Sequence, residues 1–461
     1  MKNFLKLFLI IICTLITING AICDEIQENK FDNIIENSSL KNSAIISVSI
    51  KKAGKNPIVY EKDSKKLLHP ASTLKLITIM PELSVLTDKY LFKTQIFYDE
   101  EKNVYIKLGA DPYLTSDDLK NMLFKLKNTE IFPIKNLYID ASIMDGIEWG
   151  VGWMWDNDTN PLMPKYSAFN LDQNLIKIKV QPTNLGKPAK IISSNTDTTT
   201  YMNYVTTSAD TTDICVARFN WISPNLIYLQ GSVAEDKNIN IPVSSAHIYF
   251  VNELKKHLKN IGISYEKIIY ETTPEGKTLL TEKVSGIERA VIDILQNSKN
   301  LMAETTLKIA AYKYTNEPGS TMHGIDLINE YYKPLTQNKN KEIKDIKFNI
   351  VDASGVSHNN LITTDFMTDA LIYNQSQKYF DFVKSKMARP GIGTMKNRLL
   401  DYSDSLWVKT GTLSGISGIT GYATSKSGEN YTFSILIQNY GQNSSDAKNL
   451  EDEIIKAILE L

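Results

Sequence analysis

Residues 69–86 read HPASTLKLITIMPELSVL, and this stretch decides which fold the sequence adopts. Its apolar residues recur at helical spacing after a Pro-Ala-Ser start, which predicts a buried helix that opens near Ser72. Ser72 and Lys75 then lie on the same helix face, one turn apart. A serine hydroxyl is a weak nucleophile until a base takes its proton. A lysine amine can be that base where burial and nearby cations lower its pKa, so the stretch predicts an activated serine.

A second motif, Ser298-Lys299-Asn300, supports this interpretation. Support is needed because Ser38 and Lys41 repeat the first spacing by chance. The second motif stands at the start of an apolar helix. Its hydroxyl can relay a proton between a lysine, the nucleophile and a leaving nitrogen, and its amide can bind a substrate carbonyl and position the lysine. The alternative is that Ser298 only caps the helix.

A third motif is Lys409-Thr410-Gly411-Thr412, within LWVKTGTLSGISG. Apolar residues alternate here as they do in a strand, and a strand glycine lets another backbone come close. An open strand edge can pair with an extended peptide, whose terminal carboxylate would then face Lys409 and Thr410. The alternative is an ordinary hairpin turn.

In this order, the three motifs resemble the S-x-x-K, S-D-N and K-T-G set of penicillin-binding proteins and serine β-lactamases, with Lys299 in place of the Asp. Ser298 follows Ser72 by 226 residues, and Lys409 follows Ser298 by 111. Class A β-lactamases are too short for the first gap. The chain therefore resembles the D-alanyl-D-alanine carboxypeptidases/endopeptidases called class C low-molecular-mass penicillin-binding proteins, which carry a large insert there.

Five further segments resemble motifs of this family. They are LGADPYLTSDDL (108–119), GWMWDNDTNPLMPKYSAFNLDQN (152–174), SKNLMAETTLK (298–308), DASGVSHNNLI (352–362) and RPGIGTMKNRL (389–399). Two positions depart from the family: Ala353 replaces a Gly, and His358 replaces an Arg that can help to read the substrate's free carboxylate. Because a His is mostly neutral at pH 7, the preferred stem peptide stays open.

The resemblance implies a set of site residues. The catalytic residues are Ser72, Lys75, Ser298, Asn300 and Lys409, and the substrate-binding residues are Thr410, Gly411, Thr412, Tyr166, His358 and Arg398. For the last three, packing is the alternative. The implied activity is that of a serine D-Ala-D-Ala carboxypeptidase, D-Ala-endopeptidase or both. It acts on peptidoglycan stem peptides through an acyl-enzyme, is inhibited covalently by β-lactams and serves in cell wall remodelling.

Two other functions remain open. One is β-lactam hydrolysis, although no ExxLN-like segment that could position a deacylating water lies between the first two motifs. The other is a non-catalytic peptidoglycan-binding scaffold. Neither the balance of carboxypeptidase and endopeptidase nor the oligomeric state can be predicted.

The expected fold class is α/β, a penicillin-binding protein/serine β-lactamase-like transpeptidase fold. A hairpin in residues 44–60 and strands in 406–439 would form one antiparallel sheet, flanked by helices that include 446–461. The polar stretch 24–42 is expected to be a tether.

The expected catalytic domain is discontinuous, with residues 24–95 and 281–461. A mostly β insert, 96–280, would contain helices at 115–126 and 245–262, and the resemblance implies two nested subdomains within it.

Residues 1–23 have the pattern of a secretory signal peptide, with a positive start, an apolar run from Phe4 to Ile18 and small residues after it. Cleavage after Ala21 or after Cys23 fits. A membrane anchor is the alternative, and lipidation of Cys23 is disfavoured by the bulky Ile22. No second long apolar run follows, so we expect no membrane span after cleavage and a location in the periplasm or cell envelope of a bacterium.

Composition excludes several classes of protein. The 461 residues include 51 bases and 52 acids, a net charge of −1, which argues against nucleic acid as a partner. Apolar residues make up 42 %, so the chain is not disordered. Three Cys and five scattered His offer no zinc spacing, and we expect neither a metal nor an organic cofactor.

Overall fold

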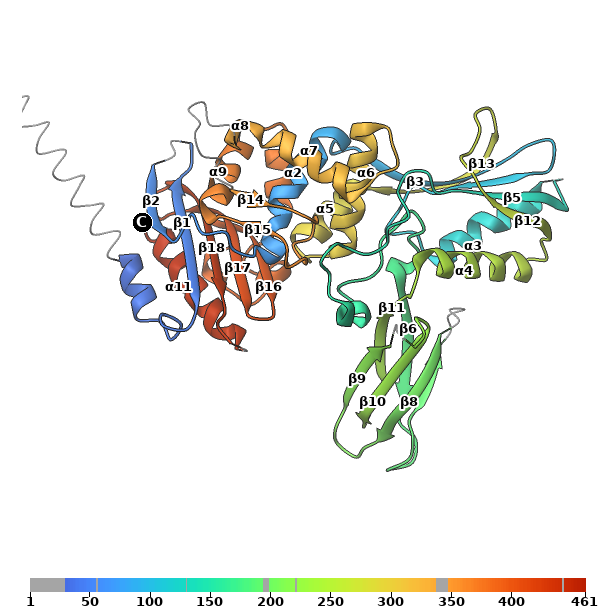
Figure 1. Ribbon diagram of the computed structural model, residues 1–461, viewed down its shortest axis with the longest axis horizontal. Helices are drawn as coiled ribbons and strands as arrows, with labels where there is room; N and C mark the ends of the chain where they lie inside the picture. Colours follow the sequence, from blue (N-terminus) through green and yellow to red (C-terminus); the bar gives the residue numbers. More distant parts are fainter. Residues whose placement is uncertain are drawn as a thin grey trace, which may run out of the picture.

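The computed structural model describes residues 30–54, 57–129, 131–193, 199–219, 222–336, 347–441 and 443–461. The expected signal peptide, with Cys13 and Cys23, lies outside these residues. Figure 1 shows a body that contains the first and last described elements of the chain, and an arm formed by the middle of the chain. Within the described residues, no helix has the length and apolar character needed to cross a membrane.

A five-stranded sheet in the order β16-β17-β18-β1-β2 forms the centre of the body, and all its neighbouring strands are antiparallel. The strands are β1 (Ile45–Lys52), β2 (Ile58–Lys62), β16 (Leu406–Leu413), β17 (Ile416–Thr424) and β18 (Asn430–Gln438). The predicted sheet from both chain ends is therefore confirmed. Almost every residue of β17 and β18 is buried because helices cover both faces.

The helices that flank the sheet are α2 (Lys75–Leu86), α5 (Ile287–Leu295), α6 (Asn300–Thr315), α7 (Thr321–Tyr331), α8 (Lys333–Thr336), α9 (Thr364–Asn374), α10 (Phe380–Ser385) and α11 (Ser444–Leu459). α2 and α9 belong to the layer on one face of the sheet, and α11 packs on the other (Figure 1). The predicted C-terminal helix is thus confirmed. A two-stranded ribbon, β14 (Phe348–Asn349) with β15 (Leu361–Ile362), lies beside α9.

The prediction of a tether over residues 24–42 is wrong for its described part. Residues 30–36 form a helix. Phe31, Ile35 and Leu40 are buried in the same apolar cluster as the inner face of α11. Their spacing is the physical reason, since apolar residues four apart make one helical stripe even in a polar segment.

The insert contains a five-stranded sheet in the order β12-β5-β4-β3-β13, with α3 (Ser116–Phe124) and α4 (Ala246–Asn260) beside it. The strands are β3 (Leu91–Tyr98), β4 (Val104–Lys107), β5 (Ile134–Asp140), β12 (Tyr265–Tyr270) and β13 (Thr278–Gly286). Both predicted insert helices are confirmed. The sheet begins at Leu91 and ends at Gly286, where β3 and β13 pair as antiparallel neighbours. The insert boundaries at 96 and 280 stay a prediction.

Six strands lie between β5 and α4 in the chain and form two three-stranded sheets, β8-β10-β9 and β11-β6-β7. They are β6 (Leu175–Gln181), β7 (Lys190–Ser193), β8 (Thr200–Thr207), β9 (Asp213–Arg218), β10 (Leu226–Val233) and β11 (Lys237–Pro242). Figure 1 shows them as a lobe that extends away from both larger sheets. The exposed free Cys215 lies in this lobe.

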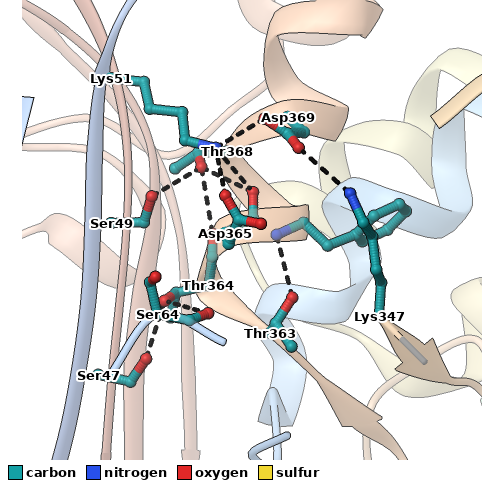
Figure 2. A network of polar contacts seen from close by, with 11 residues as sticks. Ser47, Ser49, Lys51, Ser64, Lys347, Thr363, Thr364, Asp365, Thr368 and Asp369 are labelled. Atoms are coloured by element: carbon teal, nitrogen blue, oxygen red, sulfur yellow. Dashed lines mark hydrogen bonds and ion pairs between the residues drawn. The ribbon is translucent and has the colours of Figure 1, made fainter. Parts of the chain in front are cut away.

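A polar network pins β1 to α9, as Figure 2 shows. The buried Lys51 amine donates to Asp365 at 2.5 Å and to Asp369 at 2.7 Å. Along the same strand, the Ser47 and Ser49 hydroxyls pair with threonine hydroxyls of α9 at 2.8 and 2.9 Å. The two carboxylates raise the pKa of Lys51 against the opposing effect of burial. The network therefore keeps a charged lysine between the sheet and the helix.

Replacing Lys51 with Ala should destabilise the protein by about 3 kcal/mol, because Asp365 would lose its counter-charge and Asp369 would be left with Lys347, 3.7 Å away. Lys52→Ala is the matched control. Lys52 is the next residue, and its ion pair with Glu429 is partly exposed, so its loss should cost less than about 1 kcal/mol. Urea unfolding of both variants measures the difference, and equal losses would contradict the role assigned to the network.

Candidate active site

Ser72 lies in a 3₁₀ turn, Ala71–Leu74, that leads directly into α2. The predicted helix start is therefore correct in position but begins as a tighter turn. Ala71 has a φ of +45°, a strained conformation for a residue with a side chain. Gly355 packs so closely on this turn that a Cβ there would lie 1.8 Å from the Ala71 carbonyl oxygen. The surrounding structure thus imposes the backbone geometry that presents the Ser72 hydroxyl.

Lys75 connects the first two motifs. Its Nζ lies 2.8 Å from Ser72 Oγ, 2.7 Å from Asn300 Oδ1 and 2.7 Å from the Ser354 carbonyl oxygen. The side chain is fully buried, and this burial lowers the pKa of Lys75 to about 7, although nearby carboxylates oppose the shift. A substantial fraction of this amine is therefore neutral near pH 7, as a base for Ser72 must be.

Lys409 connects the second and third motifs. Its Nζ donates to Ser298 Oγ at 2.9 Å and to the Thr410 carbonyl oxygen at 2.7 Å. Burial lowers the pKa of Lys409 well below its usual value, and the charge of Lys75 lowers it further. The three separated stretches of sequence therefore converge on one cluster that contains two buried amines.

The outer edge of the sheet provides a binding surface beside this cluster, because β16 is an edge strand. The Val408 N–H donates to the Ala388 carbonyl at 2.8 Å, on the side away from β17. Backbone groups alternate along an antiparallel strand, so the N–H and C=O groups of Thr410 and Thr412 also face this open side. The Thr410 hydroxyl bonds Thr394 Oγ1 at 2.7 Å. An extended peptide can pair with this edge.

Gly411 allows the strand and the nucleophile turn to touch. A Cβ at this position would lie 2.8 Å from the Ser72 nitrogen and 3.0 Å from the Pro70 carbonyl oxygen. Both contacts are to backbone, which cannot move aside without moving Ser72. The absence of a side chain at Gly411 therefore sets the distance between the hydroxyl and the strand.

Two buried carboxylates behind Lys75 were missed by sequence reasoning. Glu304 accepts backbone N–H bonds from Ala353 at 3.2 Å and from Ser354 at 2.9 Å, and so holds the loop whose carbonyl receives Lys75. Burial and the charge of Asp352 raise the pKa of Glu304 to about 7. The signal was present, since Glu304 belongs to the SKNLMAETTLK segment.

Asp352 organises the rest of that loop. It accepts from the Gly355 N–H at 2.8 Å, the Ser357 N–H at 2.7 Å and the Asn360 side chain at 2.8 Å. It also accepts from the Trp153 indole at 2.9 Å, which ties the segment from the insert to the body. The family-like segments 152–174 and 352–362 therefore meet at a single carboxylate.

The three remaining predicted substrate-binding residues, His358, Tyr166 and Arg398, differ in their exposure and contacts. His358 is exposed, so its side chain can contact a ligand. Its ring centroid lies 4.9 Å from that of His69. Tyr166 is 1 % exposed and packs against Trp153, with the Lys308 amine 5.0 Å from its ring centroid. Its position is therefore interior, and a substrate-facing role for Tyr166 stays a prediction.

Arg398 is also engaged elsewhere. Its guanidinium forms ion pairs with Glu451 at 2.9 Å and Asp452 at 2.7 Å, both on α11. These contacts fasten the 389–399 segment to the C-terminal helix. The charge of Arg398 is thus paired in this structure, and a substrate-binding role for Arg398 stays a prediction. Among the described residues, no cluster of His, Cys, Asp or Glu is arranged to hold a metal ion.

A turn with Ser and Lys, a second Ser and Asn, and an edge strand with Lys-Thr-Gly are the arrangement typical of serine acyl-transferring enzymes of the penicillin-binding type. Comparison with known proteins supports this class of enzyme. Residues 27–460 match the D-Ala-D-Ala carboxypeptidase 3 (S13) family, and the chain belongs to that family of serine carboxypeptidases.

The chain matches relatives over most of its length at low identity. The chain is 22 % identical over 429 residues to the D-alanyl-D-alanine carboxypeptidase DacB of Haemophilus influenzae, covering 88 % of each chain. It is 22 % identical to the D-alanyl-D-alanine carboxypeptidase of Actinomadura sp. (strain R39), covering 96 % of this chain and 86 % of the other. The crystal structure of penicillin binding protein 4 (dacB) from H. influenzae superposes with a TM-score of 0.80 at 19 % identity, over 94 % of this chain and 99 % of that one. The predicted fold class is thereby confirmed.

Replacing Gly411 with Ala should slow acylation by a fluorescent penicillin about 100-fold, because a shift of about 1 Å in a reacting group has effects of that size. The matched control is Gly286→Ala, where a Cβ would meet nothing within 4 Å. The measurement is the labelling rate of variants whose thermal midpoints are compared with wild type. Labelling of Gly411→Ala at the wild-type rate would show that the close approach does not matter.

Proposed function

We propose that Ser72 is the nucleophile of this carboxypeptidase and that it forms an acyl-enzyme with peptidoglycan stem peptides. The neutral Lys75 amine takes the Ser72 proton, and Ser72 Oγ attacks the carbonyl carbon of the penultimate D-Ala. The observation that carries the proposal is the 2.8 Å contact between Lys75 Nζ and Ser72 Oγ in a fully buried setting. Burial favours the neutral amine, which is the form that the reaction needs.

The substrate end is held along β16. The D-Ala terminal carboxylate faces the Thr410 hydroxyl and the Lys409 amine, while the peptide backbone pairs with the open strand edge. The oxyanion accepts from the backbone N–H groups of Ser72 and Thr412, and one such donor contributes about 3–4 kcal/mol in other enzymes. Thr412 suits this role because alternation along β16 directs its N–H outward.

The leaving amine must gain a proton when its bond to the carbonyl carbon breaks. Ser298 can deliver it, because its hydroxyl bonds Lys409 at 2.9 Å. Asn300 holds Lys75 through one amide atom and bonds the Leu162 carbonyl at 2.9 Å through the other, which fixes its orientation. Water then attacks the ester carbonyl, releases the shortened peptide and restores the Ser72 hydroxyl.

β-Lactams should acylate the same hydroxyl, since opening of their ring by Ser72 also yields an ester. A solved structure of penicillin binding protein 4 from H. influenzae is in complex with a novel β-lactam, and it superposes on this chain with a TM-score of 0.74 at 19 % identity. We place the reaction in the periplasm or cell envelope, because residues 1–23 have the pattern of a secretory leader and peptidoglycan lies outside the cytoplasmic membrane.

The test is digestion of purified peptidoglycan fragments followed by mass spectrometry. Wild type should release D-Ala from uncross-linked pentapeptide fragments, and the Ser72→Ala variant should release none while keeping its thermal midpoint. Splitting of cross-linked dimers in the same assay would add endopeptidase activity. Release of D-Ala by Ser72→Ala at the wild-type rate would overturn the assignment of the nucleophile.

A further inference from the structure

A hollow of about 480 Å³ lies behind the Ser298-Lys299-Asn300 turn and plays no part in the reaction described above. It is lined by both parts of the molecule, the insert and the helical layer of the body. Four cations line it: Lys177 on β6, Lys283 on β13, Arg289 on α5 and Lys299 just before α6. The hollow therefore gathers positive charge from four separate elements on a protein whose net charge is −1.

Two carboxylates also line the hollow, and both are already hydrogen-bonded. Asp118 accepts from the Thr115 backbone N–H at 3.1 Å and from its hydroxyl at 2.7 Å. Asp172 accepts from the Ser116 N–H at 3.0 Å and from the Tyr249 hydroxyl at 2.9 Å. Counting four cations against these two carboxylates leaves the lining with a formal charge of +2.

Three of the cations form no direct ion pair in the part of the chain that the structure describes, although the charge of Lys283 acts on the buried Asp111. Lys283 Nζ reaches only oxygen atoms of its own strand, at 3.4 and 3.5 Å. The Arg289 guanidinium lies over the Tyr113 ring, 3.9 Å from its centroid. Asp293 lies one turn further along α5. It accepts from the Tyr113 hydroxyl at 2.8 Å and forms no direct ion pair with Arg289 in the described residues. Lys299 also forms no ion pair. These groups are available to bind an anion.

The backbone at one wall of the hollow is strained. Asp172, Gln173 and Asn174 have φ values of +51°, +57° and +57°, and the first two line the hollow. Three successive left-handed residues with side chains are costly, and such strain persists where the surroundings enforce it, often at ligand sites. Asn174 enforces it here by accepting from the Leu171 N–H at 3.0 Å.

We propose that this hollow binds a carboxylate of the peptidoglycan substrate that lies outside the scissile D-Ala-D-Ala end. The inference rests on the proposed function. Stem peptides of peptidoglycan carry further free carboxylates, and lysine and arginine bind such groups through charge-assisted hydrogen bonds. Lys299 stands between Ser298 and Asn300, which bond the two active-site lysines. An occupant of the hollow would therefore contact the turn whose Ser298 and Asn300 bond the two amines.

The test compares two substrates that differ only in charge: cross-linked muropeptide dimers with free carboxylates, and the same dimers with the carboxyl groups outside the D-Ala termini amidated. The variants are Lys283→Glu and the milder Lys283→Gln, which remains usable if the charge reversal unfolds the protein. Lys267→Glu on β12, the opposite edge of the same sheet, is the matched control because Lys267 is exposed and outside the hollow.

Wild type and Lys267→Glu should show a KM several-fold lower for the free dimers than for the amidated ones. Both Lys283 variants should lose most of that preference, with kcat and the rate of acylation by penicillin unchanged. A preference that survives Lys283→Glu, or that wild type never shows, would overturn the inference. Failure of wild type to acylate with penicillin at all would instead reject the proposed function.

Discussion

The rest of the structure depends on the confinement of two lysine amines in one pocket from which water is largely excluded. Lys75 and Lys409 are both fully buried. Burial lowers the pKa of each amine, and the charge of Lys75 lowers the pKa of Lys409 further. In water, neither amine would be a useful base at neutral pH. Their partners, Ser72, Ser298 and Asn300, come from segments more than 200 residues apart in the chain. The fold therefore lowers the pKa of two ordinary lysines, so that a neutral amine becomes available near pH 7.

Several other features follow from this confinement. The turn before α2 is strained at Ala71, and Gly355 and Gly411 allow two backbones to press against it. Glu304 and Asp352 hold the loop whose carbonyl receives Lys75. The charges of these two carboxylates oppose the fall in the pKa of Lys75 that burial causes. The polar link from Lys51 to α9 joins β1 of the same sheet to the helical layer that contains α2.

Much of this could be predicted from the sequence because the decisive signals were local. The spacing of Ser72 and Lys75, and the alternation around Lys409, show which residues share a face. Features that depend on the fold as a whole could not be predicted. The burial of Tyr166 and the pairing of Arg398 with α11 arise from contacts between distant segments. The short helix over residues 30–36 was missed because its few apolar residues stand in a polar context.

The most direct test of the account is the titration of Lys75 itself. Lysine labelled with ¹³C at Cε reports the protonation of its own amine by NMR, and the Lys75→Met variant assigns the signal by its loss. Burial lowers the pKa of Lys75 to about 7, so its signal should titrate near neutral pH while exposed lysines remain protonated. A Lys75 signal that titrates near the ordinary lysine value, about 10.4, would contradict the account, because the amine would then be unable to activate Ser72.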